Sequence, residues 1–308
     1  MNWQGVYPAI TTPFRSDGSV DHAFLARHAR WMIDNGCRGI VALGSLGEGA
    51  TLRCEEKIEV LQTLIAAIGQ APLVAGISAL STGEAVQLAQ AAAAVGCEGL
   101  MVLPPYVYST DWREMKAHVV AILGATGKSC LLYNNPIAYR TDFRVEHISE
   151  LADEFANLHA VKESSADVRR VTAIRARCGG RLTICVGVDD AIVEGIASGA
   201  TGWIAGLVNA FPRESVRLFE LASAGSAAEA FALYRWFLPL LEMDTVPKFV
   251  QLIKLAQAQA GCGSESVRAP RLILAGRERE VALQVIAEGL KQRPQNVASS
   301  ALPTEVKP

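Results

Sequence analysis

Short apolar runs recur at regular intervals along the chain, and each is bounded by glycine, proline or small polar residues. They contain little polar alternation, which is typical of parallel strands buried on both faces. We predict eight strands, over residues 6–13, 39–43, 73–77, 99–103, 130–133, 158–162, 183–186 and 202–205.

The segments between these runs have helical spacing of apolar residues, as in Ile58, Leu61, Leu64, Ile65 and Ile68. Alternation of buried strands with helices predicts an α/β fold with a parallel sheet. Eight such units predict a (β/α)8 TIM barrel, whose active site lies at the C-terminal ends of the strands. A doubly wound sheet would need a G-x-G-x-x-G phosphate loop, and Gly-Ser-Leu-Gly-Glu at residues 44–48 does not match it.

Strand patterns stop after residue 211, and the remaining segments are amphipathic. We predict helices over residues 214–224, 227–241, 246–260 and 277–291, of which the first completes the barrel. The predicted organisation is therefore a barrel over residues 1–224 and a C-terminal helical extension packed on it over residues 225–293. Residues 294–308 are polar and aperiodic, and we expect a flexible tail.

Composition excludes several classes of protein. The chain has 308 residues, of which 50% are hydrophobic and 19% charged, so a large core is expected. A net charge of −2 argues against a nucleic-acid partner. No apolar run approaches the ~18 residues of a membrane span, and the N-terminus lacks the pattern of a signal peptide.

The cysteine and histidine residues indicate the redox compartment of the protein and whether it binds a metal ion. The seven cysteines are odd in number and form no C-x-x-C pair, so buried thiols in the reducing cytoplasm are expected. The five histidines do not cluster at the spacing of metal ligands, and we expect no metal site.

Lys162 is the candidate around which the chemistry is organised, because it ends a buried strand and Glu-Ser-Ser follows it. In a dry barrel mouth burial disfavours the ammonium form, and a neutral amine condenses with a 2-oxo acid to a Schiff base. The alternative is a lysine that extends from the strand end to the surface. Other strand ends carry hydroxyl groups that would converge on the same face, at Thr12, Ser45, Tyr106 and Tyr133.

Three short motifs sharpen this interpretation. They are Gly-Ser-Leu-Gly-Glu at residues 44–48, Tyr-Asn-Asn-Pro at residues 133–136 and Val-Lys-Glu-Ser-Ser at residues 161–165. In this order and spacing the chain resembles the dihydrodipicolinate synthase / N-acetylneuraminate lyase family of class I, Schiff-base-forming lyases. The resemblance covers roughly residues 1 to 295.

The resemblance implies a role for each matching residue. Lys162 would attack the ketone carbon of a 2-oxo acid, and Tyr133 would shuttle protons. The substrate-binding set would comprise Ser45 and the amides around Leu46 for the carboxylate, with Thr12, Tyr106, Gly187 and Ile204. The alternatives are a core tyrosine at 133 and an ordinary tight turn at 44–48. The resemblance also implies no cofactor, and a homotetramer built as a dimer of dimers.

Departures from the family pattern bear on the reaction. Leu46 replaces a second hydroxyl residue, Val107 replaces a relay tyrosine, and Ala138 replaces the arginine that holds the second substrate of the synthases. Arg140, two residues further on, either binds a distal carboxylate or lies on the surface. These departures argue against the lysine-biosynthesis reaction and favour a catabolic member of the family.

The most specific hypothesis is a deaminase/dehydratase acting on 1-pyrroline-4-hydroxy-2-carboxylate, the cyclic imine derived from 4-hydroxyproline. The alternatives are a 4-hydroxy-2-oxoglutarate or 2-keto-3-deoxy sugar acid aldolase or dehydratase, and dihydrodipicolinate synthase itself. Two further alternatives belong to other functional classes. One is a catalytically silent protein that binds 2-oxo acids, and the other is a barrel enzyme that uses pyridoxal phosphate.

Overall fold

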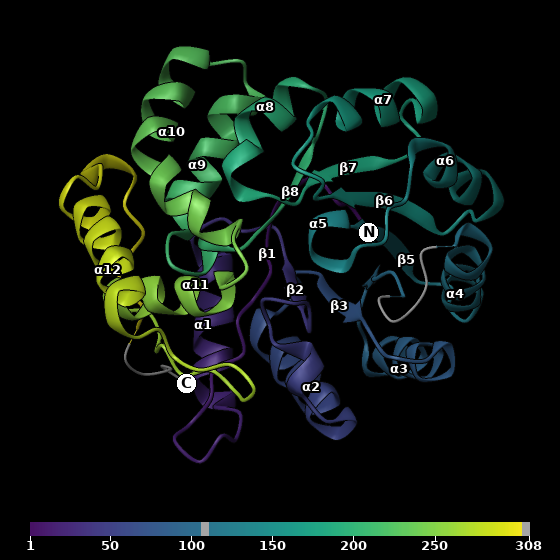
Figure 1. Cartoon of the computed structure of the whole chain (residues 1–308), viewed down its shortest axis with the longest axis horizontal. Helices are drawn as coiled ribbons and strands as arrows, with labels where there is room; N and C mark the ends of the chain where they lie inside the picture. Colours follow the sequence, from purple (N-terminus) through teal and green to yellow (C-terminus); the bar gives the residue numbers. More distant parts are fainter. Residues whose placement is uncertain (106–110, 304–308) are drawn as a thin grey trace.

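Eight parallel strands form the centre of the molecule (Figure 1), in a computed structural model that describes residues 1–105 and 111–303. The strand order is β1-β8-β7-β6-β5-β4-β3-β2. β1 pairs with β8, and an isolated bridge between Ala9 and Val41 connects the β1 and β2 sides. The predicted (β/α)8 barrel is thereby confirmed. The strands are β1 Gly5–Pro8, β2 Ile40–Ala42, β3 Leu73–Ile77, β4 Gly99–Val102, β5 Ser129–Asn134, β6 Leu158–Glu163, β7 Thr183–Val186 and β8 Gly202–Ala205.

Helices surround the strands, and side-chain caps set several of their starts. Asp21 accepts a hydrogen bond from the Phe24 amide, Ser81 from Glu84, and Asp111 from Arg113. The barrel helices are α1 His22–Asp34, α2 Cys54–Ile68, α3 Thr82–Val95, α4 Trp112–Gly124, α5 Pro136–Tyr139, α6 Val145–Glu154, α7 Arg169–Cys178, α8 Ile192–Ala197 and α9 Pro212–Ser223.

The barrel interior holds its own apolar cluster, separate from the larger cluster between strands and helices. It includes Tyr7, Val41, Val74, Leu131 and Ile204, all buried. The first strand ends at Pro8, earlier than predicted, although the amides of Ala9 and Ile10 still donate to the carbonyls of Ala205 and Val41. The amide of Thr11 donates to the Asn209 side chain rather than to a neighbouring strand.

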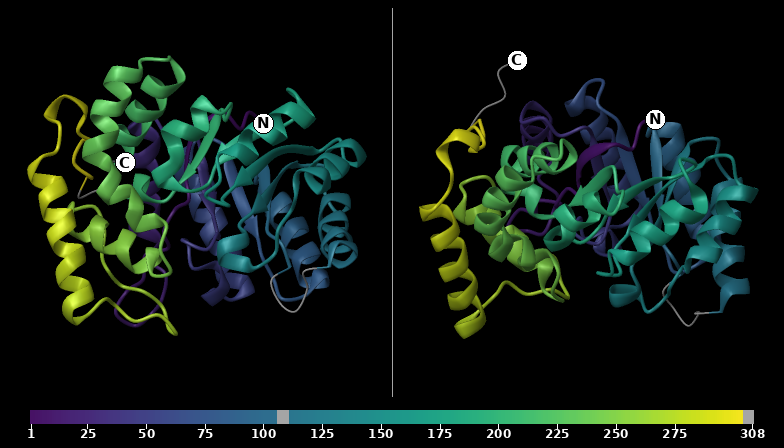
Figure 2. Two further views of the ribbon diagram at one scale, coloured as in Figure 1. Left: turned by 45° about the horizontal axis from the view of Figure 1, so that its top comes forward. Right: turned by 90° about the horizontal axis from the view of Figure 1, so that it is seen from above.

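In the part of the chain that the structure describes, the C-terminal extension beside the barrel comprises the α-helices α10 Ala227–Leu241, α11 Phe249–Gln259 and α12 Gly276–Lys291 (Figure 2). The buried ammonium of Lys254 on α11 pairs with Glu48 at 2.6 Å and so connects the extension to the loop after β2. Beyond α12 the chain returns to the barrel, where the carbonyl of Ser300 accepts a hydrogen bond from Trp31 at 2.8 Å.

Over the described ranges, every helix is too short or too polar to cross a membrane.

Candidate active site

A cavity of about 430 Å³ lies at the C-terminal ends of the strands. Its wall combines residues from β5, β6, the loops after β2, β7 and β8, and the extension. Six of the predicted site residues line it: Lys162, Tyr133, Ser45, Leu46, Gly187 and Ile204.

The strand register puts Lys162 beside Tyr133. These residues are direct partners in the parallel pair of β5 and β6. The Lys162 Nζ lies 4.3 Å from the centre of the Tyr133 ring, and the lysine is only 7% exposed. Contact with the ring face holds the amine inside the cavity rather than at the surface.

The next residue on each strand points away from the cavity, because successive side chains alternate. Asn134 donates to Glu163 at 3.0 Å, and its Oδ1 accepts from the Phe143 amide at 2.9 Å. Glu163 also accepts from the Ser165 amide at 2.7 Å. The polar residues after Tyr133 and Lys162 in the motifs therefore fix the two strand ends.

Asn135 connects Tyr133 to the short helix α5. Its Nδ2 donates to the Tyr133 hydroxyl at 3.0 Å, and its Oδ1 accepts from the Ala138 amide at 2.9 Å. Pro136 occupies the first turn, where its missing N–H costs nothing. The helix carries Tyr139 to the cavity wall, where its hydroxyl bonds to the Ser45 hydroxyl.

A buried hydroxyl without a protein partner lies in the same wall. Among the described residues, the Ser164 Oγ makes no hydrogen bond, although the residue is 0% exposed. A Cβ at position 187 would lie 1.9 Å from this oxygen and 2.7 Å from the Lys162 Cε. Glycine at 187 is therefore required for the lysine and this hydroxyl to reach the cavity together.

Three predicted site residues have other positions. Thr12 is buried outside the cavity wall, and its hydroxyl donates to the Gly47 carbonyl at 2.6 Å, which fixes the loop that carries Ser45. Arg140 is exposed at the end of α5 and is not part of the wall. Tyr106 lies outside the residues that the structure describes.

Two carboxyl groups lie near Lys162. Asp189 is fully buried and accepts hydrogen bonds from the Trp203 indole and from the amides of Gly206 and Leu207, at 2.7–3.0 Å. Burial raises the pKa of Asp189 to about 6. Asp244 lines the cavity, and burial, together with the charge of Asp189, raises its pKa well above the usual range.

Three residues that were not predicted from the sequence, Tyr139, Asp244 and Arg271, also line the cavity. Tyr139 could have been suspected from its place just after the Tyr-Asn-Asn-Pro motif. Asp244 and Arg271 come from the extension, and no local pattern distinguishes them from surface residues. The Arg271 guanidinium lies 3.7 Å from Glu48, so the same carboxylate contacts both Lys254 and a cation of the cavity wall.

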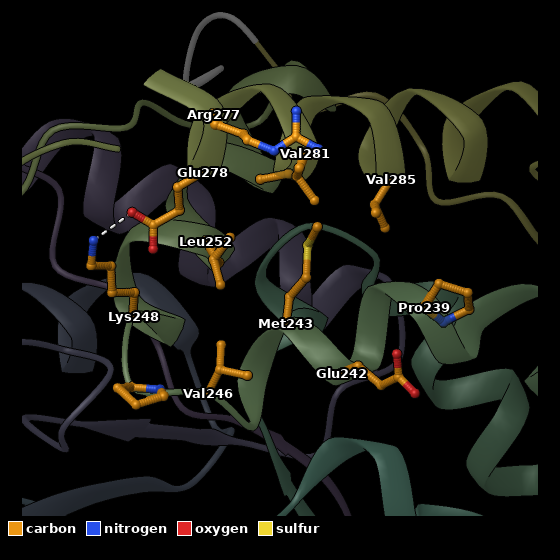
Figure 3. A pocket seen from close by; sticks show the side chains of 12 residues that line it. Pro239, Glu242, Met243, Val246, Lys248, Leu252, Arg277, Glu278, Val281 and Val285 are labelled. Atoms are coloured by element: carbon orange, nitrogen blue, oxygen red, sulfur yellow. Dashed lines mark hydrogen bonds and ion pairs between the residues drawn. The ribbon is translucent and has the colours of Figure 1, made fainter. Parts of the chain in front are cut away.

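A second cavity, of about 600 Å³, lies within the extension (Figure 3). Aliphatic side chains such as Met243, Leu252 and Val285 dominate its wall, and the Lys248–Glu278 ion pair lies at its edge. Both side chains of that pair are about half exposed, and among the described residues the wall has no buried amine beside a phenol. The chemistry-bearing groups converge on the smaller cavity, which we take as the active site.

The fold and this site define a (β/α)8 barrel with an amine at the C-terminal end of β6 and a phenol beside it on β5. Over residues 2–288 the chain matches the dihydrodipicolinate synthetase family. It belongs to that family and is a class I aldolase or lyase.

Relatives and solved structures agree with this assignment. The 4-hydroxy-tetrahydrodipicolinate synthase of Methanococcus maripaludis strain C6 is 30% identical over 268 residues, 87% of this chain and 92% of the relative. The corresponding enzyme of Acidithiobacillus ferrooxidans is 34% identical over 232 residues, 75% of this chain and 79% of the relative.

Among solved structures, the 4-hydroxy-tetrahydrodipicolinate synthase of Methylacidiphilum fumariolicum SolV superimposes with a TM-score of 0.90 at 28% identity, covering 94% of this chain and 96% of the other. The chloride-inhibited dihydrodipicolinate synthase of Acinetobacter baumannii, complexed with pyruvate, gives 0.89 at 28% identity, covering 94% and 99%.

Proposed function

We propose that this protein is a lyase that binds a short 2-oxo acid, or its cyclic imine, as a Schiff base on Lys162. The observation that carries the proposal is the pairing of a buried amine with a phenol on the neighbouring strand, inside a cavity at the carboxyl ends of a barrel. A catalytically silent binding protein would have no need of this pair.

The chemistry follows from the positions of the groups. The amine adds to the ketone carbon, water leaves, and the resulting iminium withdraws electrons from the adjacent C3. Tyr133, whose hydroxyl accepts from Asn135, then exchanges protons with the carbinolamine and with C3. The Ser45 hydroxyl, the backbone around Leu46 and the Tyr139 hydroxyl form a polar edge suited to the substrate carboxylate.

For the substrate we favour 1-pyrroline-4-hydroxy-2-carboxylate, which deamination and dehydration would convert to an open-chain 2-oxo acid. Ala138 supports this choice, because it stands where the synthases carry an arginine for their second substrate. The named relatives support dihydrodipicolinate synthase as the second candidate. An aldolase for 4-hydroxy-2-oxoglutarate or a 2-keto-3-deoxy sugar acid would use the same iminium.

Intact-mass spectrometry after borohydride reduction in the presence of pyruvate tests the mechanism. Wild type is expected to gain one reduced pyruvate, and Lys162→Ala to gain none and to lose activity by a factor on the order of 10⁶. If wild type is labelled by neither pyruvate nor 2-oxoglutarate, the protein is not a Schiff-base lyase.

The products then distinguish the three candidate reactions. Release of ammonia from the cyclic imine would support the deaminase, glyoxylate from 4-hydroxy-2-oxoglutarate the aldolase, and condensation of pyruvate with aspartate semialdehyde the synthase. We also propose a homotetramer, by extension from the family resemblance. Light scattering that shows a monomer would contradict it.

A further inference from the structure

The side chain of Asp244 lies in the active-site wall, and Schiff-base formation assigns it no role. The residue belongs to a short 3-10 turn, Glu242–Asp244, between α10 and α11 of the extension. The buried side chain of Met243 anchors this turn in the core, and Asp244 lines the cavity that holds Lys162. Val246 and Pro247, which follow it, line both this cavity and the aliphatic one of Figure 3.

The carboxyl group of Asp244 packs directly against the backbone of Gly206. A Cβ at Gly206 would lie 1.9 Å from the Asp244 Oδ1. The loop after β8 thus leaves space for the carboxyl group where any other residue would displace it. This close approach fixes the position of Asp244 relative to the strand ends.

Asp244 is chemically unengaged, unlike Asp189 beside it. Three hydrogen-bond donors of the protein satisfy Asp189. The Asp244 carboxyl group, by contrast, makes neither a hydrogen bond nor an ion pair with any residue that the structure describes. Its hydrogen-bonding capacity is directed to whatever occupies the cavity.

The charges around Asp244 favour its protonated form. Burial and the negative charges of Asp189 and Asp190 raise its pKa, and the Lys162 ammonium lowers it. In the Schiff base the Lys162 nitrogen is part of an iminium, which is also cationic. A carboxylic acid held in this way can donate a proton near neutral pH.

Position decides which part of a substrate meets this acid. Ser45 and Tyr139, the polar edge, come from the loop after β2 and from α5 after β5. Asp244 contacts the loop after β8, and β8 and β5, after which Tyr139 comes, lie on opposite sides of β6 and its lysine. A 2-oxo acid with its carboxylate at the polar edge and C2 on Lys162 extends its C3 and C4 atoms toward Asp244.

We propose that Asp244 is the acid that protonates a hydroxyl group leaving from C4, and that the substrate class is therefore a 4-hydroxy-2-oxo acid or its cyclic imine. This inference rests on the proposed Schiff-base function. The C3–H proton passes to a base, and its electron pair forms the enamine. The enamine then forms the C3–C4 double bond while the C4–O bond breaks with its electron pair. The Asp244 proton converts the departing oxygen to water, and solvent reprotonates the carboxylate.

Two probes that differ in their leaving group test the role. The first is 4-hydroxy-2-oxopentanoate, whose hydroxyl needs an acid. The second is 4-fluoro-2-oxopentanoate, whose fluoride leaves without one. Asp244→Asn is expected to slow dehydration of the hydroxy probe by about 10²-fold or more, as loss of a general acid does, and to release fluoride at close to the wild-type rate. Glu242→Gln, an exposed carboxyl change in the same turn, should alter neither rate.

Several outcomes would overturn the role. One is an equal loss on both probes, and another is no loss on the hydroxy probe. A third is a wild-type enzyme that converts the hydroxy probe to pyruvate and acetaldehyde rather than to the unsaturated acid. Pyruvate trapping is run on every variant, because wild type that forms no adduct would refute the Schiff-base function instead. An adduct with no elimination of either probe would refute this inference alone.

A measurement on wild type covers the case in which Asp244→Asn fails to fold. The acid form of Asp244 is the active one, so dehydration of the hydroxy probe should fall as the pH rises through its pKa. Fluoride release should not show that fall. Parallel pH profiles for the two probes would contradict the role of Asp244 without any variant.

Discussion

The two sides of the active-site cavity are built in different ways. One side comes from strands, where Tyr133 and Lys162 are register partners within the hydrogen-bonded barrel. The other side comes from a four-residue helix, a 3-10 turn and an irregular segment, which supply Tyr139, Asp244 and Arg271. Each of these three depends on a few side-chain contacts rather than on a sheet.

This difference separates the reaction from the choice of substrate. Imine formation needs the amine and the phenol at a fixed spacing, and the sheet register provides it. The groups that meet the distal part of the substrate lie on loops and on the extension, which can change without disturbing the barrel. Variants on the strand side should therefore reduce the rate for every substrate, and variants of Asp244 and Arg271 should discriminate between substrates.

Tyr133→Phe tests the strand side and should have the largest effect after loss of the lysine. The ring that contacts the Lys162 Nζ remains, and the hydroxyl that accepts from Asn135 is lost. We expect kcat to fall about 10²–10⁴-fold, the range for loss of a general acid–base group, with the unfolding midpoint little changed. Steady-state kinetics and thermal denaturation measure the two quantities.

Tyr7→Phe is the matched control, since it removes a buried tyrosine hydroxyl of the same barrel interior outside the cavity wall. It should leave kcat unchanged. Equal losses in the two variants would mean that Tyr133 supports the barrel and not the reaction.

Glu48→Gln tests the attachment of the extension to the barrel. Glu48 is 1% exposed and is paired with the equally buried Lys254, which also donates to the carbonyls of Thr12 and Ser266. Removing one charge leaves a buried cation without its counter-ion, so we expect a loss of about 3–5 kcal/mol in the free energy of unfolding. Chemical denaturation measures it.

Two controls define the cause of that loss. Lys248→Ala breaks an exposed ion pair with Glu278 and should cost about 1 kcal/mol or less. Adding Lys254→Met to Glu48→Gln should recover part of the stability, because the unpaired cation is then absent. If the double variant is no more stable than Glu48→Gln, desolvation of Lys254 is not the source of the cost.

The strand side was also the side that the sequence predicted well. Uninterrupted apolar runs identify buried strands because both faces of each strand must be covered, and eight of them imply the barrel. Lys162 and Tyr133 end such runs, so their convergence on one face followed from topology. Gly187 and Ile204 were assigned from the family resemblance, and they line the cavity from corresponding positions after β7 and in β8.

The loop side could not be predicted with the same rules. Thr12 was predicted to bind the substrate, and the structure places its hydroxyl against the Gly47 carbonyl, a contact that depends on a turn geometry invisible in the sequence. Asp244 and Arg271 lie far along the chain from the motifs, and only the packing of the extension brings them to the cavity. Residues positioned by tertiary contacts leave no periodic signal.

Arg271→Ala tests whether the extension recognises the distal end of the substrate, and it should have the smallest effect. Arg271 lines the cavity and is held by Glu48, whereas Arg140 points to solvent outside the wall. A cation here should attract a carboxylate remote from the reacting carbon. In the borohydride trapping assay we expect the concentration of 2-oxoglutarate that gives half-maximal labelling to rise about tenfold, with maximal labelling unchanged, as for loss of a binding contact. Half-saturation by 2-oxobutanoate, which has no distal carboxylate, should stay the same. Arg277→Ala, which removes a cation from the wall of the second cavity, should change neither value. If Arg140→Ala instead weakens the binding of 2-oxoglutarate and Arg271→Ala does not, the distal carboxylate is bound by the residue that follows α5. Substrate recognition would then belong to the barrel loops and not to the extension.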